Sequence, residues 1–129
     1  HVHTLSQMRD HMAYVDAVML GRAAYDDPCV LAPVDELFYG HTRELPTRYE
    51  LVQRMIPYMR EWQAVGISPR SVIRHMLGLF ASQPGARKWK QVLSGKIPDE
   101  VDPAELMERA LDPVPDEVKP RPLGEPQPV

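Results

Sequence analysis

The chain has 129 residues, of which 43% are hydrophobic and 26% charged, and its formal net charge is −3. These values fit one compact domain with extensions and exclude a large enzyme within this chain. No apolar run approaches the ~20 residues that a membrane helix needs, and nothing resembles a signal peptide, so we expect a cytosolic protein. The single cysteine, Cys29, excludes an internal disulfide and a cysteine metal cluster.

The N-terminal residues carry a helix signal and then a strand signal. Thr4-Leu5-Ser6-Gln7 has the form of a helix capping box, and the apolar spacing behind it predicts a short helix over residues 5–13. Val15–Leu20, VDAVML, is short, rich in branched residues and almost wholly apolar, which predicts a parallel strand covered on both faces. One such strand cannot stand alone, so its partners lie outside this chain or the strand prediction is wrong.

A proline-interrupted helix follows. Asp27-Pro28 predicts its start, because proline is favoured at the first helical position. Pro33 lacks a backbone donor, so we expect a kink or a restart there. Gly40 is expected to end the element.

The clearest helical periodicity of the chain begins at a second capping box, Thr47-Arg48-Tyr49-Glu50, and continues to Val65. We expect Pro57 to bend this helix and Gly66 to end it. Ser68-Pro69 predicts the start of another helix. Its buried side is expected to carry four large apolar residues: Ile73, Met76, Leu77 and Phe80.

Gln83-Pro84-Gly85 breaks this apolar run, and a further apolar face extends from Ala86 to Gly95. A last helix is predicted over Pro103–Leu111, capped by Asp102 with Glu105 three residues on. Several antiparallel helices with short connections predict a helix bundle, so the fold class of the chain is mainly α. Residues 112–129 contain six prolines and show no periodicity, and we expect them to form a disordered, proline-rich acidic tail.

Two residues after the apolar strand pattern suit phosphate. Gly21 permits close approach of the backbone, the amides at a helix start point outward, and Arg22 adds a fixed positive charge. The alternative is that Gly21 serves a tight turn and Arg22 is solvated. Gly-Arg is a very short signal, so the spacing alone favours the alternative.

Charge is distributed unevenly along the chain. The segment from Ile67 to Pro98 contains six lysines and arginines and no acidic residue, whereas the chain from Asp99 onward carries −6. Such a basic segment favours an anionic partner, with nucleic acid first, because backbone phosphates are what basic patches neutralise. Arg87, Lys88 and Lys90 flank Trp89, whose helical spacing with apolar neighbours is more typical of a core residue than of a stacking platform.

No catalytic residue and no metal site follows from the spacing. His1 and His3 precede no further ligand at a recognised distance, and the other histidines are isolated in the sequence. Cys29 has apolar neighbours and is expected to be a packed thiol rather than a nucleophile. No Ser-His-Asp set or carboxylate pair can be argued either.

The chain resembles one known family in three strings: VDAVMLGRAAYDDPCVLAPVDELFYG, MIPYMREWQAVG and IRHMLGLFASQPGARKWKQVLSG. They are similar to the C-terminal part of the bacterial-type tRNA-dihydrouridine synthase A family, over about residues 14–95. Members of that family combine an N-terminal FMN-binding TIM barrel with a C-terminal helical domain. They use NADPH to reduce a uridine of the tRNA D-loop to dihydrouridine.

The resemblance implies an organisation for the chain. Residues 1–40 would be the last strand and helix of a TIM barrel whose remainder is missing, with Asp16 to Leu20 as the strand. Residues 41–111 would be a helical tRNA-binding domain, followed by the tail of residues 112–129.

The resemblance also implies roles for individual residues. Phosphate sites of TIM barrels commonly follow the last two strands, so Gly21 and Arg22 are expected to contact the FMN phosphate. The tRNA-contacting positions of the family fall on Arg87 and Lys90. Lys90 stands where arginine is usual, which keeps the charge but loses the planar fork of the guanidinium.

Several parts of the family pattern are missing from this sequence: seven of the eight barrel strands, the glycine-rich half of the phosphate site and the catalytic cysteine. Cys29 lies on the wrong side of the last strand and does not inherit that role. We therefore expect a fragment of a longer monomeric enzyme that is inactive alone. Two alternatives remain open: a stand-alone helical RNA-binding module, and a helical interaction protein whose basic face balances its acidic tail.

Overall fold

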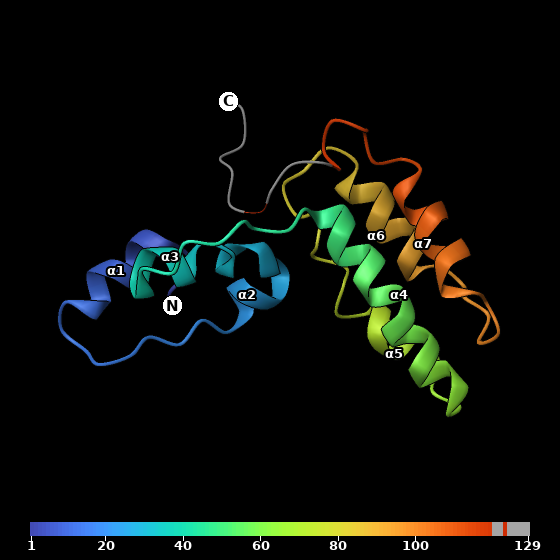
Figure 1. The fold of residues 1–129 in the computed structure, drawn as a ribbon, viewed down its shortest axis with the longest axis horizontal. Helices are drawn as coiled ribbons and strands as arrows, with labels where there is room; N and C mark the ends of the chain where they lie inside the picture. Colours follow the sequence, from blue (N-terminus) through green and yellow to red (C-terminus); the bar gives the residue numbers. More distant parts are fainter. Residues whose placement is uncertain (120–122, 124–129) are drawn as a thin grey trace.

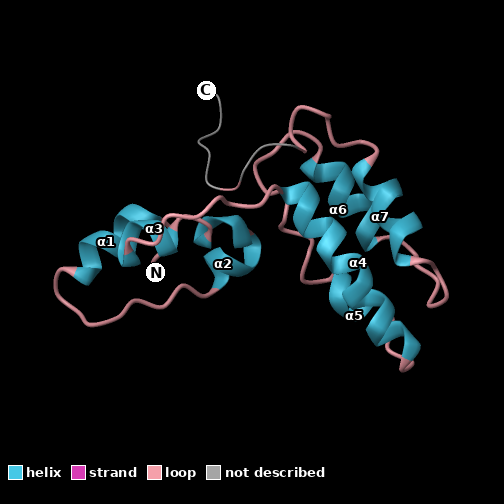
Figure 2. Cartoon of the chain, viewed as in Figure 1, coloured by secondary structure: helices cyan, strands magenta, loops and turns pink. Residues whose placement is uncertain are grey.

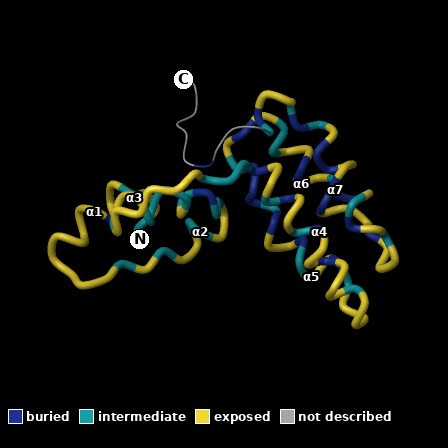
Figure 3. Tube along the Cα trace, viewed as in Figure 1, coloured by how far each residue is buried: buried dark blue, intermediate teal, exposed yellow. Residues whose placement is uncertain are grey.

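The structure, a computed structural model, describes residues 1–119 and Leu123. Within these residues every regular element is a helix (Figure 2), which confirms the expectation of a mainly helical chain. Figure 1 shows three short helices, α1 to α3, lying apart from a larger group formed by α4 to α7. Burial is concentrated in the larger group, whereas most of residues 1–40 are exposed (Figure 3).

The first helix, α1 (Leu5–Met12), forms as predicted. The Thr4 side chain accepts a hydrogen bond from the Gln7 amide at 3.2 Å, and the Gln7 side chain accepts one from the Thr4 amide, so the capping box is complete. These bonds satisfy amides that a helix start leaves without an intrahelical partner. The helix buries only Met8 and therefore adds little to a core.

The strand predicted over Val15–Leu20 is wrong for the described chain, which contains no strand. The segment is irregular, and Met19 keeps 81% of its surface exposed. A strand is defined by hydrogen bonds to a neighbour, and no described segment pairs with this one. The apolar pattern is present, but the partner that would make it a strand is not part of the described structure.

Three short elements follow: α2 (Arg22–Asp26), the 3₁₀ helix η1 (Pro28–Leu31) and α3 (Val34–Tyr39). The predicted restart at Pro33 is confirmed, because this proline stands between η1 and α3. Gly40 adopts the left-handed conformation with a φ of 69°, and its amide donates to the Asp35 and Glu36 carbonyls. This αL cap ends α3 as predicted.

The longest helix is α4 (Arg48–Ala64), and its capping box between Thr47 and Glu50 is confirmed by bonds of 2.8 and 3.1 Å. Pro57 lies inside the helix, and a bend there stays a prediction. Gly66, with a φ of 86°, follows the helix end. The side of α4 that faces the other helices buries four residues: Arg48, Val52, Ile56 and Met59.

The long helix predicted after Ser68-Pro69 is wrong. The element α5 (Arg70–Ile73) has four residues, and the chain then makes a series of tight turns as far as Gly85. Their amides bond three residues back, as in Met76 to Ile73 at 2.8 Å and Leu79 to Met76 at 3.1 Å. Ile73, Met76 and Phe80 are buried as predicted, whereas Leu77 is only partly buried, and Leu79, which was not predicted, is buried.

The core lies between α4, the turns after α5, α6 (Ala86–Ser94) and α7 (Pro103–Leu111). Trp89 is fully buried, its ring centroid lies 4.7 Å from that of Phe80, and its indole N–H donates to the Met76 carbonyl at 3.1 Å. The interpretation of Trp89 as a core residue is confirmed. Burial with a satisfied N–H is what a buried tryptophan requires.

Asp102 stands at the start of α7, but its side chain does not cap the helix. Its carboxylate accepts three bonds from the Arg60 guanidinium, at 2.9, 3.1 and 3.2 Å, and thereby links the start of α7 to α4. The capping role predicted for Asp102 is therefore wrong. Both partners are about half exposed, so we expect this ion pair to contribute less than about 1 kcal/mol.

At residues 112–119 and at Leu123, the structure differs from the disorder expected for residues 112–129. Val114 and Val118 are buried in the core cluster, and the Leu123 amide donates to the Pro46 carbonyl at 3.1 Å. Two valines spaced four residues apart can cover one apolar surface even where no long periodic pattern announces it. Residues 120–122 and 124–129 lie outside the described residues.

Candidate functional site

The first candidate, Gly21-Arg22, lies at the start of α2, and both residues are exposed. The Gly21 carbonyl accepts from the amides of Ala24 and Tyr25 at 3.2 and 3.3 Å, so the chain turns directly into a helical turn. A Cβ at Gly21 would meet only the Met19 sulfur at 3.6 Å, so packing does not demand glycine there. Outward amides beside an arginine are a donor set that fits a phosphate group.

The second candidate is the outer face of α6. Arg87 and Lys90 are three residues apart on this helix, so they share one face, and both are exposed together with Lys88. The buried Trp89 lies between them in the sequence and anchors the helix to the core. The orientation of this basic face therefore follows from the packing of one aromatic side chain.

The turn before α6 has a packing reason. Gly85 adopts the left-handed conformation with a φ of 85°, and a Cβ there would lie 2.9 Å from the Cα of Val114. A side chain would be strained by the backbone conformation and would also press on the segment after α7. The predicted break at Gln83-Pro84-Gly85 thus ends the preceding turns. It also places the start of α6 in contact with Val114.

The cations of α6 have no acidic partner within the described part of the chain. The ion pairs there join Arg43 to Asp35, Arg60 to Asp102 and Lys119 to Asp116. The Lys119 ammonium and its hydrogen bond lower the pKa of the Asp116 carboxyl, which is fully exposed. Arg87 and Lys90 remain available to an anion brought by another molecule.

A contact that the sequence did not predict joins the α2 segment to the helical group. A Cβ on Gly78 would clash with the Asp26 carbonyl, whose carbon would lie only 2.8 Å away, and would stand 3.2 Å from the Tyr25 oxygen. Glycine is therefore required by the close approach of two backbones. The isolated glycine inside an apolar pattern was the available signal.

Side chains reinforce this joint, which we define as Gly78 and Leu79 with the residues that contact them from α2, η1 and α4. The Leu79 carbonyl accepts from the buried Arg48 at 2.9 Å and from the Cys29 thiol at 3.5 Å. Beside it, the Tyr25 hydroxyl lies 3.2 Å from Nδ1 of His75. His75, interpreted from the sequence as an isolated histidine, thus belongs to the contact between α2 and the turns after α5.

Cys29 is a packed thiol, as predicted. It is buried, and this burial raises the pKa of the thiol above its usual value, while the nearby Arg48 acts in the opposite direction. A raised pKa keeps the sulfur protonated and unreactive at neutral pH.

Metal and membrane features are absent from the part of the chain that the structure describes. Among those residues, no group of three or more His, Cys, Asp or Glu side chains is arranged to hold a metal ion. No described helix combines the length and the apolar character needed to cross a membrane.

Comparison with known proteins places these features in a family. The model of the dihydrouridine synthase (Dus) family matches residues 1–114. A tRNA-dihydrouridine(20/20a) synthase of Vibrio vulnificus is 35% identical over 117 residues, which are 91% of this chain and 36% of that protein. The synthase of the same name from Synechocystis sp. is 40% identical over 105 residues, 81% of this chain and 31% of that protein.

A third relative of that name, from Pasteurella multocida, is 37% identical over 110 residues, covering 85% of this chain and 34% of that protein. The chain therefore spans about a third of the length of these curated relatives. The family match includes α2, the joint and the basic face of α6. Because it extends over most of the sequence, this chain belongs to the dihydrouridine synthase family.

Proposed function

We propose that this chain is the tRNA-binding part of a tRNA-dihydrouridine synthase, an oxidoreductase that reduces a D-loop uridine of tRNA with FMN and NADPH. The observation that carries the proposal is the family match over residues 1–114, whose relatives bear the name tRNA-dihydrouridine(20/20a) synthase. We place the complete protein in the cytoplasm as a monomer. No catalytic residue is assigned to this chain, and we expect the chain to be inactive alone.

The basic face of α6 would hold the RNA. Arg87 and Lys90 are exposed on one side of a helix, and Trp89 fixes that helix to the core from the other side. Exposed cations without acidic neighbours bind backbone phosphates by displacing counterions, which gives affinity without reading sequence. Lysine at position 90 would contact phosphate as a point charge rather than as a two-pronged donor.

Gly21 and Arg22 would contribute to the phosphate site of the flavin. Bound FMN would carry the hydride from NADPH to the uracil ring. Support comes from the donor set at the start of α2 and from the family match over residues 1–114, which includes both residues. Gly21 would offer backbone amides, and Arg22 would neutralise part of the phosphate charge.

The test uses the complete protein with a tRNA transcript, NADPH and FMN. The double variant Arg87→Ala/Lys90→Ala should weaken tRNA binding and reduce the slope of log K against log salt by about 0.7–0.9 for each phosphate that is no longer neutralised. The matched control, Arg9→Ala/Arg43→Ala, removes the same charge elsewhere. An equal effect of both double variants on affinity and slope would show that the α6 face does not hold tRNA.

The flavin assignment is tested separately. Arg22→Ala should lower the affinity for FMN, measured by the quenching of flavin fluorescence on binding, while Arg9→Ala should not. Full retention of FMN by Arg22→Ala would exclude the proposed phosphate contact. Dihydrouridine formation by the unaltered protein tests the activity itself, and its absence would refute the enzyme assignment.

A stand-alone RNA-binding module is the second candidate. One observation favours it: the core of α4, α6 and α7 includes fully buried Met59, Trp89 and Leu106 and draws little on residues 1–40. This group of helices has the core of an independent domain. A complete protein that binds tRNA but neither retains FMN nor forms dihydrouridine would establish this candidate.

A further inference from the structure

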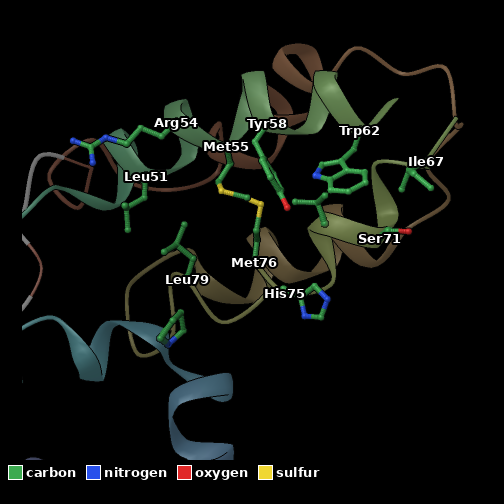
Figure 4. Close-up of a pocket in the computed structure, with 12 residues that line it drawn as sticks. Leu51, Arg54, Met55, Tyr58, Trp62, Ile67, Ser71, His75, Met76 and Leu79 are labelled. Carbon is green, nitrogen blue, oxygen red and sulfur yellow. The ribbon is translucent and has the colours of Figure 1, made fainter. Parts of the chain in front are cut away.

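A groove runs between α4 and the chain from Ile67 to Leu79, and the proposed function does not use it. Its volume is about 750 Å³, within the ~300–1,000 Å³ range of small-molecule sites. Figure 4 shows side chains from α4 pointing across the groove toward the turns after α5. The floor is apolar and includes Leu51, Met55, Met76 and Leu79.

Two aromatic side chains form one wall of the groove. Tyr58 and Trp62 lie one turn apart on α4, with ring centroids 6.1 Å apart and an interplanar angle of 75°. They remain 44% and 43% exposed, whereas the other tryptophan, Trp89, is fully buried. Large aromatic rings left half exposed over an apolar floor offer contact surface that no described residue uses.

The lining of the groove contains no acidic residue. Its twelve residues include Arg54, Ser71 and His75. The opposite wall belongs to the acid-free segment that begins at Ile67, and the exposed Arg74 donates to Nε2 of the lining His75 at 3.1 Å. An apolar floor with this charge suits a flat aromatic group attached to a polyanion.

We propose that this groove binds an unstacked nucleobase of the tRNA. Single-stranded RNA is recognised by stacking bases on aromatic side chains and by hydrogen bonds to their edges. Tyr58 and Trp62 would contact the base. Ser71 and Arg54, which line the same groove, would make polar contacts to it. This inference rests on the proposed function and adds a second RNA contact to the basic face of α6.

The competing occupant is a protein segment, because the matched residues cover only about a third of the length of the relatives. The charge of the groove favours RNA over a generic apolar segment, since the lining includes Arg54 and no acidic residue, and the exposed Arg74 donates to the lining His75. A phosphate backbone entering the groove would meet no acidic lining residue. The two occupants lead to different outcomes in one experiment.

The experiment measures tRNA affinity of the complete protein for Trp62→Ala, Tyr58→Ala and the matched control Tyr49→Ala. Tyr49 also lies on α4 and is 43% exposed, but it does not line the groove. Each groove variant should lower affinity by about 5- to 150-fold, the range measured when an aromatic partner of one base is removed. The salt slope should stay unchanged, because the protein still neutralises the same phosphates.

Fluorescence provides an independent readout. Binding of tRNA should quench the fluorescence emission of Trp62, which is the emission that is lost in the Trp62→Phe variant. Trp62→Phe should also retain most of the tRNA affinity that Trp62→Ala loses. Unchanged affinity in both alanine variants, relative to Tyr49→Ala, would overturn the inference. So would a lower thermal midpoint of Trp62→Ala together with unaltered tRNA binding, which would show that Trp62 serves packing within the protein and not RNA.

Failure of the inference is distinguishable from failure of the proposed function. If the unaltered protein forms dihydrouridine and Arg87→Ala/Lys90→Ala weakens tRNA binding while Trp62→Ala does not, only the groove inference falls. If the unaltered protein does not bind tRNA, the proposed function and the inference fall together.

Discussion

Gly78→Ala should disturb the joint between α2 and the helical group. The new Cβ would lie 2.8 Å from the Asp26 carbonyl carbon and 3.2 Å from the Tyr25 oxygen, and both neighbours are backbone atoms that cannot rotate away. One of the two segments must therefore shift. Overpacking of this kind costs about 1–3 kcal/mol of unfolding free energy.

The shift also threatens contacts that depend on the same approach. The Tyr25–His75 hydrogen bond at 3.2 Å and the Cys29–Leu79 contact at 3.5 Å span the same two segments. Each ordinary hydrogen bond contributes about 0.5–1.5 kcal/mol, so breaking them adds to the steric cost. We expect the free energy of unfolding to fall by about 1–3 kcal/mol from the clash, and by about a further 0.5–1.5 kcal/mol if the Tyr25–His75 bond breaks.

Urea unfolding of the complete protein measures this change through the midpoint, with the slope m unchanged. Gly95→Ala is the matched control. A Cβ at Gly95 would lie 3.4 and 3.6 Å from the Val92 and Gln91 oxygens, which is ordinary van der Waals contact, and its φ of −71° is allowed for alanine. Equal midpoints for the two alanine variants would refute the close approach at Gly78. Loss of activity with an unchanged midpoint would show instead that Gly78 acts without holding the joint.

Three further predictions concern local contacts. Thr47→Ala removes the capping box of α4 and should cost about 1 kcal/mol in thermal or urea unfolding, whereas a cost near zero would show that the cap is dispensable. Arg48→Met removes the charged donor to the Leu79 carbonyl and should cost about 1.5–3 kcal/mol, with no loss expected if that bond does not persist. Burial raises the Cys29 pKa in the folded protein above the usual 9.0. The contribution of this thiol to the free energy of unfolding is therefore fully present below about pH 9, and it is lost as the pH rises through the pKa of the folded state. Alkylation of Cys29 should accordingly begin at a higher pH than alkylation of a free thiol. In Arg48→Met it should begin at a still higher pH, since Arg48 lowers the pKa of Cys29. Alkylation that begins at the pH of a free thiol would contradict the raised pKa.

The parts of the site that follow from the chain itself were predicted well. Trp89 was expected in the core from its helical spacing, and the break at Gln83-Pro84-Gly85 was expected from turn chemistry; both are confirmed. The roles of Gly21, Arg22, Arg87 and Lys90 came from family resemblance and stay proposals. The joint at Gly78 was missed, because a close approach between residues 26 and 78 leaves no local pattern beyond the glycine itself.

The sequence by itself determined the features that are settled within a few residues: both capping boxes, the αL end at Gly40 and the apolar sides of α4 and α6. Their hydrogen bonds and periodicity are local, so composition and spacing specify them.

The tertiary structure decided whether each apolar run has a partner. Val15–Leu20 has a strand composition, but no segment among the described residues pairs with it, and it is irregular. The apolar run through Met76 and Phe80 forms tight turns instead of a regular helix, and the Asp26 carbonyl packs closely against Gly78 within them. Local propensity was overridden in the first place by the lack of a described pairing partner and in the second by a contact with a distant segment, because burial and pairing depend on what lies across the interface rather than on the segment itself.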